Sequence, residues 1–126
     1  MKNKTILYSL VGVLFGYFLF AQVVLADCSD AYSYADDAYS YAKKGYNAGN
    51  LEDVHYYAKK AMSAAEDAMP AAGDCGCDDA YSYADNAYSY ARKAYRSDDF
   101  DQAVEYMRKA KSAAEDAMSV ADDCGT

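Results

Sequence analysis

The chain has 126 residues, 53% of them hydrophobic, and carries 20 Asp and Glu against 12 Lys and Arg, for a formal net charge of −8. This length limits the fold to one domain or two very small ones. The acidic balance argues against nucleic acid and anionic lipid head groups as partners, because both would be repelled.

The first 26 residues have the pattern of a secretory signal peptide. The basic Lys2 and Lys4 are followed by an apolar run over residues 6–20 and by small residues at 24 and 26. Such a signal is cleaved, here before Asp27. A retained membrane anchor is the alternative, but spanning a bilayer takes about 20 apolar residues. We expect a secreted or periplasmic protein without a stable membrane anchor, with 10 Lys and Arg against 20 Asp and Glu.

The rest of the chain is one unit written twice. Residues 28–76 align without a gap with residues 77–125, "CSDAYSYADDAYSYAKKGY" against "CDDAYSYADNAYSYARKAY", and "SAAEDAM" recurs later in each unit. Equivalent positions, such as Cys28 and Cys77, differ by 49 throughout. We therefore expect two structural repeats, at residues 27–76 and 77–126.

The first half of each unit predicts an amphipathic helix. At 100° per residue, Ala31, Ala35, Ala38 and Ala42 form one stripe, and polar side chains lie opposite. The seven-residue repeat and the many alanines argue against a strand. Tyrosines flank the stripe on both edges, and we take them as the candidate binding surface: Tyr32, Tyr34, Tyr39, Tyr41 and Tyr46, with Tyr81, Tyr83, Tyr88, Tyr90 and Tyr95 in the second unit.

A turn and a second helix follow in each unit. "NAGN" at 47–50 predicts a turn in which Gly49 and the asparagines cap the two helices, and "RSDDF" at 96–100 predicts capping by Ser97 or Asp98. Another apolar stripe, with alanines, Met62 and Met69, runs from residue 51 to 69. Two helices joined by a short turn lie antiparallel, so each unit is expected to be a helical hairpin.

The hairpin predicts the disulfides. Its two ends meet, so Cys28 is expected to bond Cys75, and Cys77 to bond Cys124. Pairing Cys28 with Cys77 and Cys75 with Cys124 would tie unit to unit instead, and remains an alternative. A thiolate metal site at Cys75-Gly76-Cys77 would need Cys28 and Cys124 to converge on that seam, and its spacing is shorter than that of most zinc sites. We expect disulfides in an exported chain this short, because it buries too little apolar surface to be stable without cross-links.

Residues suited to catalysis are scarce. The only histidine is His55, and because its counterpart in the second unit is Val104 we expect it to be a packing or surface residue rather than a catalyst. It is also the one candidate metal ligand outside the cysteines and carboxylates. No phosphate-binding glycine loop, histidine-based triad or paired histidines are present in the sequence. We expect no enzyme, no catalytic residue and no cofactor.

Two family resemblances accompany these patterns. "YAKKGYNAGNLEDVHYYAKKAM" and "YARKAYRSDDFDQAVEYMRKAK" resemble the helix-turn-helix of tetratricopeptide repeats, although the period differs from the 34 residues of that family. The resemblance implies helical hairpins and peptide binding. The frame "AKKGY" followed by "LEDVHYYAKKAMSAA" is similar to small periplasmic metal-binding proteins, with Tyr39, Tyr41 and Tyr46 where that family carries histidine. Neutral tyrosine is a poor ligand for copper or nickel.

Together these patterns predict an all-α protein of two tandem antiparallel helical hairpins, four helices in all, each hairpin closed by a disulfide. The leading hypothesis is an exported interaction module that binds a protein partner, or itself, through tyrosine-lined surfaces, because tyrosine gives contact area at low entropic cost. The alternative function is metal-ion binding and sequestration. Tyrosines that only seal the packed helices, or that cross-link by oxidation, are further interpretations.

Overall fold

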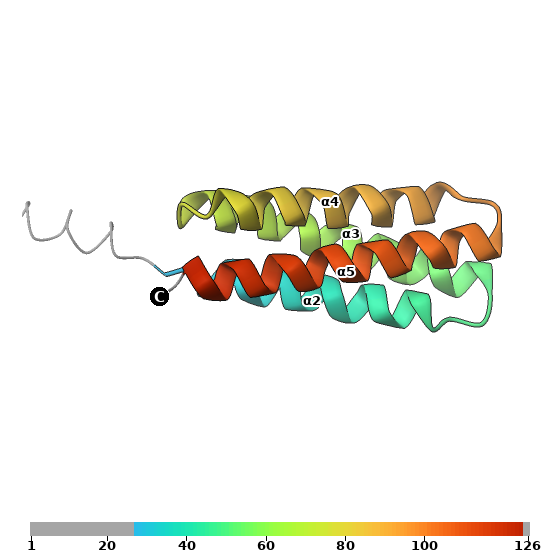
Figure 1. The fold of residues 1–126 in the computed structure, drawn as a ribbon. Helices are drawn as coiled ribbons and strands as arrows, with labels where there is room; N and C mark the ends of the chain where they lie inside the picture. Colours follow the sequence, from blue (N-terminus) through green and yellow to red (C-terminus); the bar gives the residue numbers. More distant parts are fainter. Residues whose placement is uncertain (1–26, 125–126) are drawn as a thin grey trace, which may run out of the picture.

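The computed structural model describes residues 27–124, which fold into four helices and no strand (Figure 1). The helices are α2 (Ser29–Tyr46), α3 (Leu51–Asp74), α4 (Asp78–Arg96) and α5 (Phe100–Cys124). The predicted all-α class is confirmed. The expected signal peptide, residues 1–26, lies outside the described residues. Within residues 27–124 no helix combines the length and the apolar character needed to cross a membrane.

The four helices form a closed bundle. α2 packs against α3 and α4 against α5, as predicted, while α3 with α4 and α2 with α5 complete the ring (Figure 1). The diagonal pair α2 and α4 barely touches. One buried cluster joins Ala42 and Val54 of the first hairpin to Ala91 and Met107 of the second. The two repeats therefore share one core.

Alanine makes up almost all of this core. Among the buried apolar residues between 27 and 124, only Cys28, Val54, Cys77 and Met107 are of another type. Met62 and Met69, two members of the predicted stripe, lie half-buried at its margin. Close packing of helices along alanine stripes leaves little room for longer side chains between them, which explains their place at the edge.

An alanine core contributes little free energy per residue. Burial is worth about 0.8 kcal/mol per methylene-sized group, against about 1.5–3 kcal/mol for a complete Leu, Ile or Phe side chain. The bundle therefore depends on additional constraints. Two disulfides supply them, Cys28–Cys75 with Cα atoms 5.3 Å apart and Cys77–Cys124 with Cα atoms 6.0 Å apart. The within-unit pairing is confirmed.

Each hairpin turn is capped by a side chain at the start of its second helix. The Asn50 carboxamide oxygen accepts from the Asp53 N–H at 2.8 Å, and the Asp99 carboxylate accepts from the Gln102 N–H at 2.8 Å. The expectation that Ser97 or Asp98 caps α5 is therefore wrong. Helix α5 begins at Phe100, and the residue directly before the first helical residue is placed to accept from the free N–H groups.

Of the residues expected to cap the helices at the first turn, the two asparagines do so and Gly49 does not. Gly49 does not adopt the left-handed cap, because Gly76 is the only described residue with a positive φ. Asn47 occupies the C-cap of α2 instead. Ser97 is the C-cap of α4. In the loop between α4 and α5, Ser97 is buried, and Asp99, two positions later, caps α5.

The seam between the hairpins is a fixed turn. Gly76 has φ 76°, the Cys77 N–H donates to the Ala72 carbonyl at 2.9 Å, and the Gly76 N–H donates to the Gly73 carbonyl at 3.1 Å. This pair of bonds is the Schellman motif that ends helices at a left-handed glycine. Cys75-Gly76-Cys77 is thus a helix stop followed at once by the start of α4.

Replacing Gly76 by alanine is expected to lower the free energy of unfolding by about 1 kcal/mol, because a left-handed conformation costs an L-residue roughly 1–2 kcal/mol. Gly73→Ala is the matched control. Gly73 lies within α3 with open space around its Cβ position, so alanine there is expected to stabilise by about 0.5–1 kcal/mol. Urea unfolding of both variants measures the difference, and equal effects would contradict a strained Gly76.

Candidate functional site

The ten candidate tyrosines flank the buried alanine stripes as predicted, but they differ in exposure. Five are exposed and five are half-buried. The exposed rings are Tyr32, Tyr34, Tyr46, Tyr81 and Tyr95, and the half-buried rings are Tyr39, Tyr41, Tyr83, Tyr88 and Tyr90. The candidate surface therefore mixes packing residues with accessible ones.

Lysines cover several of these rings. Lys44 and Lys60 place their Nζ atoms 5.6 and 5.5 Å from the Tyr41 ring centre. In the second hairpin Lys93 and Lys109 lie 5.5 and 5.8 Å from Tyr90. A cation over an aromatic face within about 6 Å is attractive. Tyr41 and Tyr90 thus act mainly as packing residues whose faces are already engaged, which supports the sealing role for this pair.

His55 connects the two hairpins. Its Nε2 lies 2.7 Å from the Ser97 carbonyl oxygen, so this nitrogen carries the proton and donates, and its ring meets Tyr95 at 5.8 Å. The equivalent place between Val104 and Ala48 is apolar, and both residues pack on the same buried cluster. Within residues 27–124, no cluster of three or more His, Cys, Asp or Glu side chains placed to share an ion includes His55.

A shallow hollow lies on the outer surface of each hairpin. We name them the α2–α3 hollow, of about 210 Å³, and the α4–α5 hollow, of about 220 Å³. Six residue pairs related by the 49-residue offset line both and are identical in type: Tyr34 and Tyr83, Tyr41 and Tyr90, Lys60 and Lys109, Ser63 and Ser112, Ala64 and Ala113, and Asp67 and Asp116. The repeat therefore builds the same polar and aromatic surface twice.

The two hollows differ in charge. Asp37 lines the α2–α3 hollow where Asn86 lines the other, and Arg108 adds a cation to the α4–α5 hollow. Arg108 is paired with Glu105 one helical turn away. This guanidinium, mainly through its hydrogen bonds, holds the pKa of Glu105 below the ordinary value. The α2–α3 hollow is the more acidic of the two.

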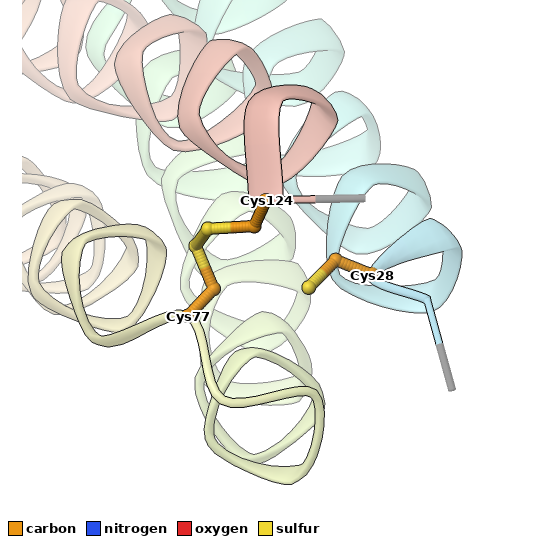
Figure 2. Close-up of side chains that lie close together, drawn as sticks. All are labelled: Cys28, Cys77 and Cys124. Carbon is orange, nitrogen blue, oxygen red and sulfur yellow. A yellow bond between two sulfur atoms is a disulfide. The ribbon is translucent and has the colours of Figure 1, made fainter. Parts of the chain in front are cut away.

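The cysteines gather at the end of the bundle opposite the hairpin turns. The Sγ atoms of Cys28, Cys77 and Cys124 lie within 4.8 Å of one another. Figure 2 shows the Cys28 sulfur directed toward the Cys77–Cys124 disulfide. Three of the four sulfurs that a thiolate metal site at this seam would need therefore converge, but all four cysteines are bonded in pairs and offer no thiolate in this form.

The surroundings of this cysteine cluster are acidic. A hollow of about 390 Å³ beside Cys75 is lined by Asp27, Asp30, Asp67 and Asp74. The Asp27 carboxylate accepts from the Ser29 hydroxyl at 2.8 Å. This bond, together with one from the Ser29 N–H, lowers the pKa of Asp27. The end of the bundle that carries the four cysteines is therefore strongly anionic at neutral pH.

Sequence reasoning found the tyrosines and the disulfides but not the residues that complete the two hollows. Lys60, Ser63 and Asp67 come from α3 and meet Tyr34 and Tyr41 of α2 only after the hairpin closes. Their unchanged recurrence at the 49-residue offset was the available signal. Comparison with protein-family models, with curated proteins and with solved structures finds no match for this chain.

Proposed function

We propose that this protein is a non-enzymatic exported module that binds a protein partner through its two tyrosine-lined hollows. The observation that carries the proposal is the recurrence of one lining, with two tyrosines, a lysine, a serine and an aspartate, on both hairpins. Disulfides are typical of exported proteins, which supports a secreted or periplasmic location.

The size of the hollows favours a protein over a free small ligand. Pockets for drug-sized ligands have volumes of about 300–1,000 Å³ and enclose most of the ligand. Hollows of about 210 and 220 Å³ on an open surface instead suit one side chain projecting from a partner. Tyr34 keeps 39% of its surface exposed and has no ring partner among the described contacts, so it is free to pack on such a side chain.

The order of the helices places the hollows on opposite sides of the bundle. Because α2, α3, α4 and α5 follow one another around the ring, the α2–α3 and α4–α5 seams face away from each other (Figure 1). One molecule could therefore hold two partner molecules at once. Binding at both seams would bridge the partners without any change in the bundle.

Metal sequestration is a second candidate function, favoured by the acidic hollow beside Cys75; four aspartates line it, although within residues 27–124 no three of them are placed to share one ion. Carboxylate oxygens are ligands for hard cations such as calcium. Titration calorimetry with calcium, copper, zinc and iron tests it directly. Heat from calcium alone that disappears in an Asp30→Asn, Asp74→Asn variant would support this function over partner binding.

Partner binding is tested with substitutions in the hollows. The immobilised exported protein is expected to retain a partner from its native extracellular or periplasmic fraction. A Tyr34→Ser, Tyr83→Ser variant is expected to weaken that binding at least about tenfold, or about 1.4 kcal/mol of binding free energy. Tyrosines at interfaces often contribute this much when they are removed. Affinity is then measured with the purified partner, and the expected stoichiometry is two partners per molecule.

Tyr81→Ser is the matched control. Its ring is 46% exposed but does not line either hollow, so the affinity should not change. Sedimentation of the protein alone at high concentration tests a second copy as the partner. Retention that is equal in the double variant and the control would contradict the assignment of binding to the hollows.

A further inference from the structure

We infer that the cysteine cluster is a thiol–disulfide exchange site, at which attack by an external thiol converts the two native disulfides into one buried Cys28–Cys77 disulfide and two thiols, Cys75 and Cys124. This inference does not depend on the proposed binding function. It rests on the position, burial and spacing of the four sulfur atoms.

Burial decides which sulfur an external thiol can reach. Cys28 and Cys77 keep only 3% and 1% of their surface exposed, whereas Cys75 is partly exposed and Cys124 is exposed. Each disulfide therefore joins one buried cysteine to one more accessible cysteine. Exchange depends on access to the attacked sulfur. Attack at Cys75 expels the Cys28 thiolate, and attack at Cys124 expels the Cys77 thiolate.

The helix termini favour the same leaving groups. Cys28 and Cys77 are the N-caps of α2 and α4, while Cys75 is the C-cap of α3 and Cys124 is the last residue of α5. A helix N-terminus stabilises a thiolate and a C-terminus disfavours one, and a more stable thiolate leaves faster. Aspartates in the first turns of α2 and α4 oppose this effect, but they are exposed to water, which screens them.

The spacing allows the expelled thiolate to react within the molecule. Cys28 Sγ lies within 4.8 Å of both sulfurs of the other disulfide (Figure 2). After an external thiolate attacks Cys75 and forms a mixed disulfide there, the Cys28 thiolate attacks Cys77. The Cys28–Cys77 bond forms, the Cys77–Cys124 bond breaks, and Cys124 leaves as a thiolate that takes a proton.

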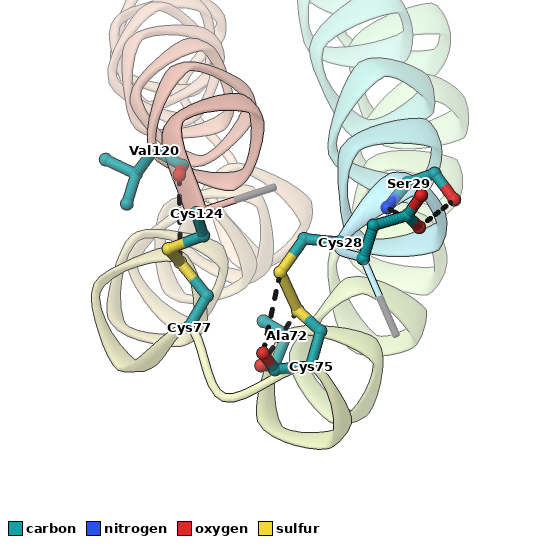
Figure 3. The surroundings of a disulfide bond; sticks show 8 residues. Cys28, Ser29, Ala72, Cys75, Cys77, Val120 and Cys124 are labelled. Carbon is teal, nitrogen blue, oxygen red and sulfur yellow. Dashed lines mark hydrogen bonds between the residues drawn. A yellow bond between two sulfur atoms is a disulfide. The ribbon is translucent and has the colours of Figure 1, made fainter. Parts of the chain in front are cut away.

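A second external thiol completes the reaction. Its thiolate attacks the external sulfur of the mixed disulfide, and Cys75 leaves and is protonated. Two external thiols become one external disulfide, and the protein gains two electrons and two protons. Entry at Cys124 gives the same product, because the expelled Cys77 thiolate attacks Cys28 and expels Cys75. Cys75 Sγ lies 3.4 Å from the Ala72 carbonyl oxygen, which is placed to accept from the new thiol (Figure 3).

The exchange changes which helices are joined by a disulfide. The native bonds each close one hairpin, whereas Cys28–Cys77 joins the starts of α2 and α4, two helices that barely touch. The product presents two accessible thiols at one end of the bundle. It could return both electrons to a disulfide of another protein.

The acidic surroundings indicate the class of thiol that reacts at Cys75. The hollow beside this sulfur is lined by four aspartates, so a cationic thiol is attracted and an anionic thiol repelled. Cysteamine and 2-mercaptoethanesulfonate are similar in size and opposite in charge. At equal thiolate concentration, cysteamine is expected to react about tenfold faster at low salt, and the difference should shrink in high salt.

The test is to trap the form of the protein that holds one disulfide and two thiols. The intact exported protein is treated briefly with cysteamine, quenched with one alkylating reagent, fully reduced, and labelled with a second. Tandem mass spectrometry then locates both labels in the species that contained one disulfide. The first label is expected on Cys75 and Cys124 and the second on Cys28 and Cys77. Finding the second label on Cys28 with Cys75, or on Cys77 with Cys124, would overturn the inference.

Two variants keep the test decisive if the intermediate is too brief to trap. In concentrated sucrose, which favours the folded bundle, Cys75→Ser, Cys124→Ser retains only the buried cysteines and is expected to oxidise to an intramolecular disulfide, with its helicity confirmed by circular dichroism. The matched Cys28→Ser, Cys77→Ser variant retains the two outer sulfurs and is expected to form an intramolecular disulfide at least about tenfold more slowly, because an intramolecular reaction rate depends on how closely the groups are held. Failure of the first variant to close, or equal closure rates, would contradict the exchange site.

Discussion

Replacing Cys77 and Cys124 together by serine is expected to lower the free energy of unfolding by about 4 kcal/mol. The two cysteines are 47 residues apart in sequence, and a cross-link over a loop of that length restricts the unfolded chain by about this amount in the chain-entropy treatment. The total free energy of unfolding of a small domain is about 5–15 kcal/mol. Since alanine supplies nearly all of the buried side chains, most of the remaining stability should disappear with the second disulfide.

Urea unfolding followed by helical circular dichroism measures this effect. Cys28→Ser, Cys75→Ser is the matched variant, because its loop has the same sequence separation of 47. The two loops do not overlap, so each disulfide restricts a different part of the unfolded chain, and the protein lacking both is expected to retain little stability. A loss below about 1 kcal/mol in either single-disulfide variant would show that the alanine bundle stabilises itself.

Replacing Met107 by alanine is expected to cost about 2–4 kcal/mol, the range for truncating a buried methionine. Met107 is 0% exposed and fills a space that exists because residue 45 is glycine. A Cβ at Gly45 would lie 2.6 Å from Met107 Cε and 3.2 Å from its Cγ. In the equivalent place of the other half, the pair is Ala94 and Ala58. The two repeats therefore fill the same space in different ways.

A double-mutant cycle tests whether Gly45 and Met107 are energetically coupled. Gly45→Ala alone is expected to destabilise by about 1 kcal/mol, because overpacking costs roughly 1–3 kcal/mol and the better helix propensity returns only about 1 kcal/mol. The variant with both Gly45→Ala and Met107→Ala should lose at least about 1 kcal/mol less than the sum of the single losses.

The transplanted pair is the control for this cycle. Ala58→Met alone should be overpacked, whereas Ala58→Met with Ala94→Gly recreates the Gly45 and Met107 arrangement in the other half and should recover stability. Additive losses in both halves would show that Met107 and Gly45 are not coupled. The same urea unfolding measurements give all of these values.

Local and repeat patterns predicted the helices, the hairpins and the disulfide pairing. An alanine stripe such as Ala31, Ala35, Ala38 and Ala42 defines the face of a helix that must be buried, because helical periodicity is a property of neighbouring residues. A short turn then makes the hairpin antiparallel. Cys28 and Cys75, at its two ends, must meet whatever the rest of the molecule does.

The arrangement of one hairpin against the other could not be read in the same way. His55 donates to Ser97 across 42 residues, Met107 packs on Gly45, and Cys28 approaches Cys77 and Cys124 only because α2 lies beside α5 in the closed ring. These contacts depend on which alanine stripes face each other. Several arrangements of amphipathic helices bury the same stripes, so only the tertiary packing of the two hairpins decided between them and formed the cysteine cluster.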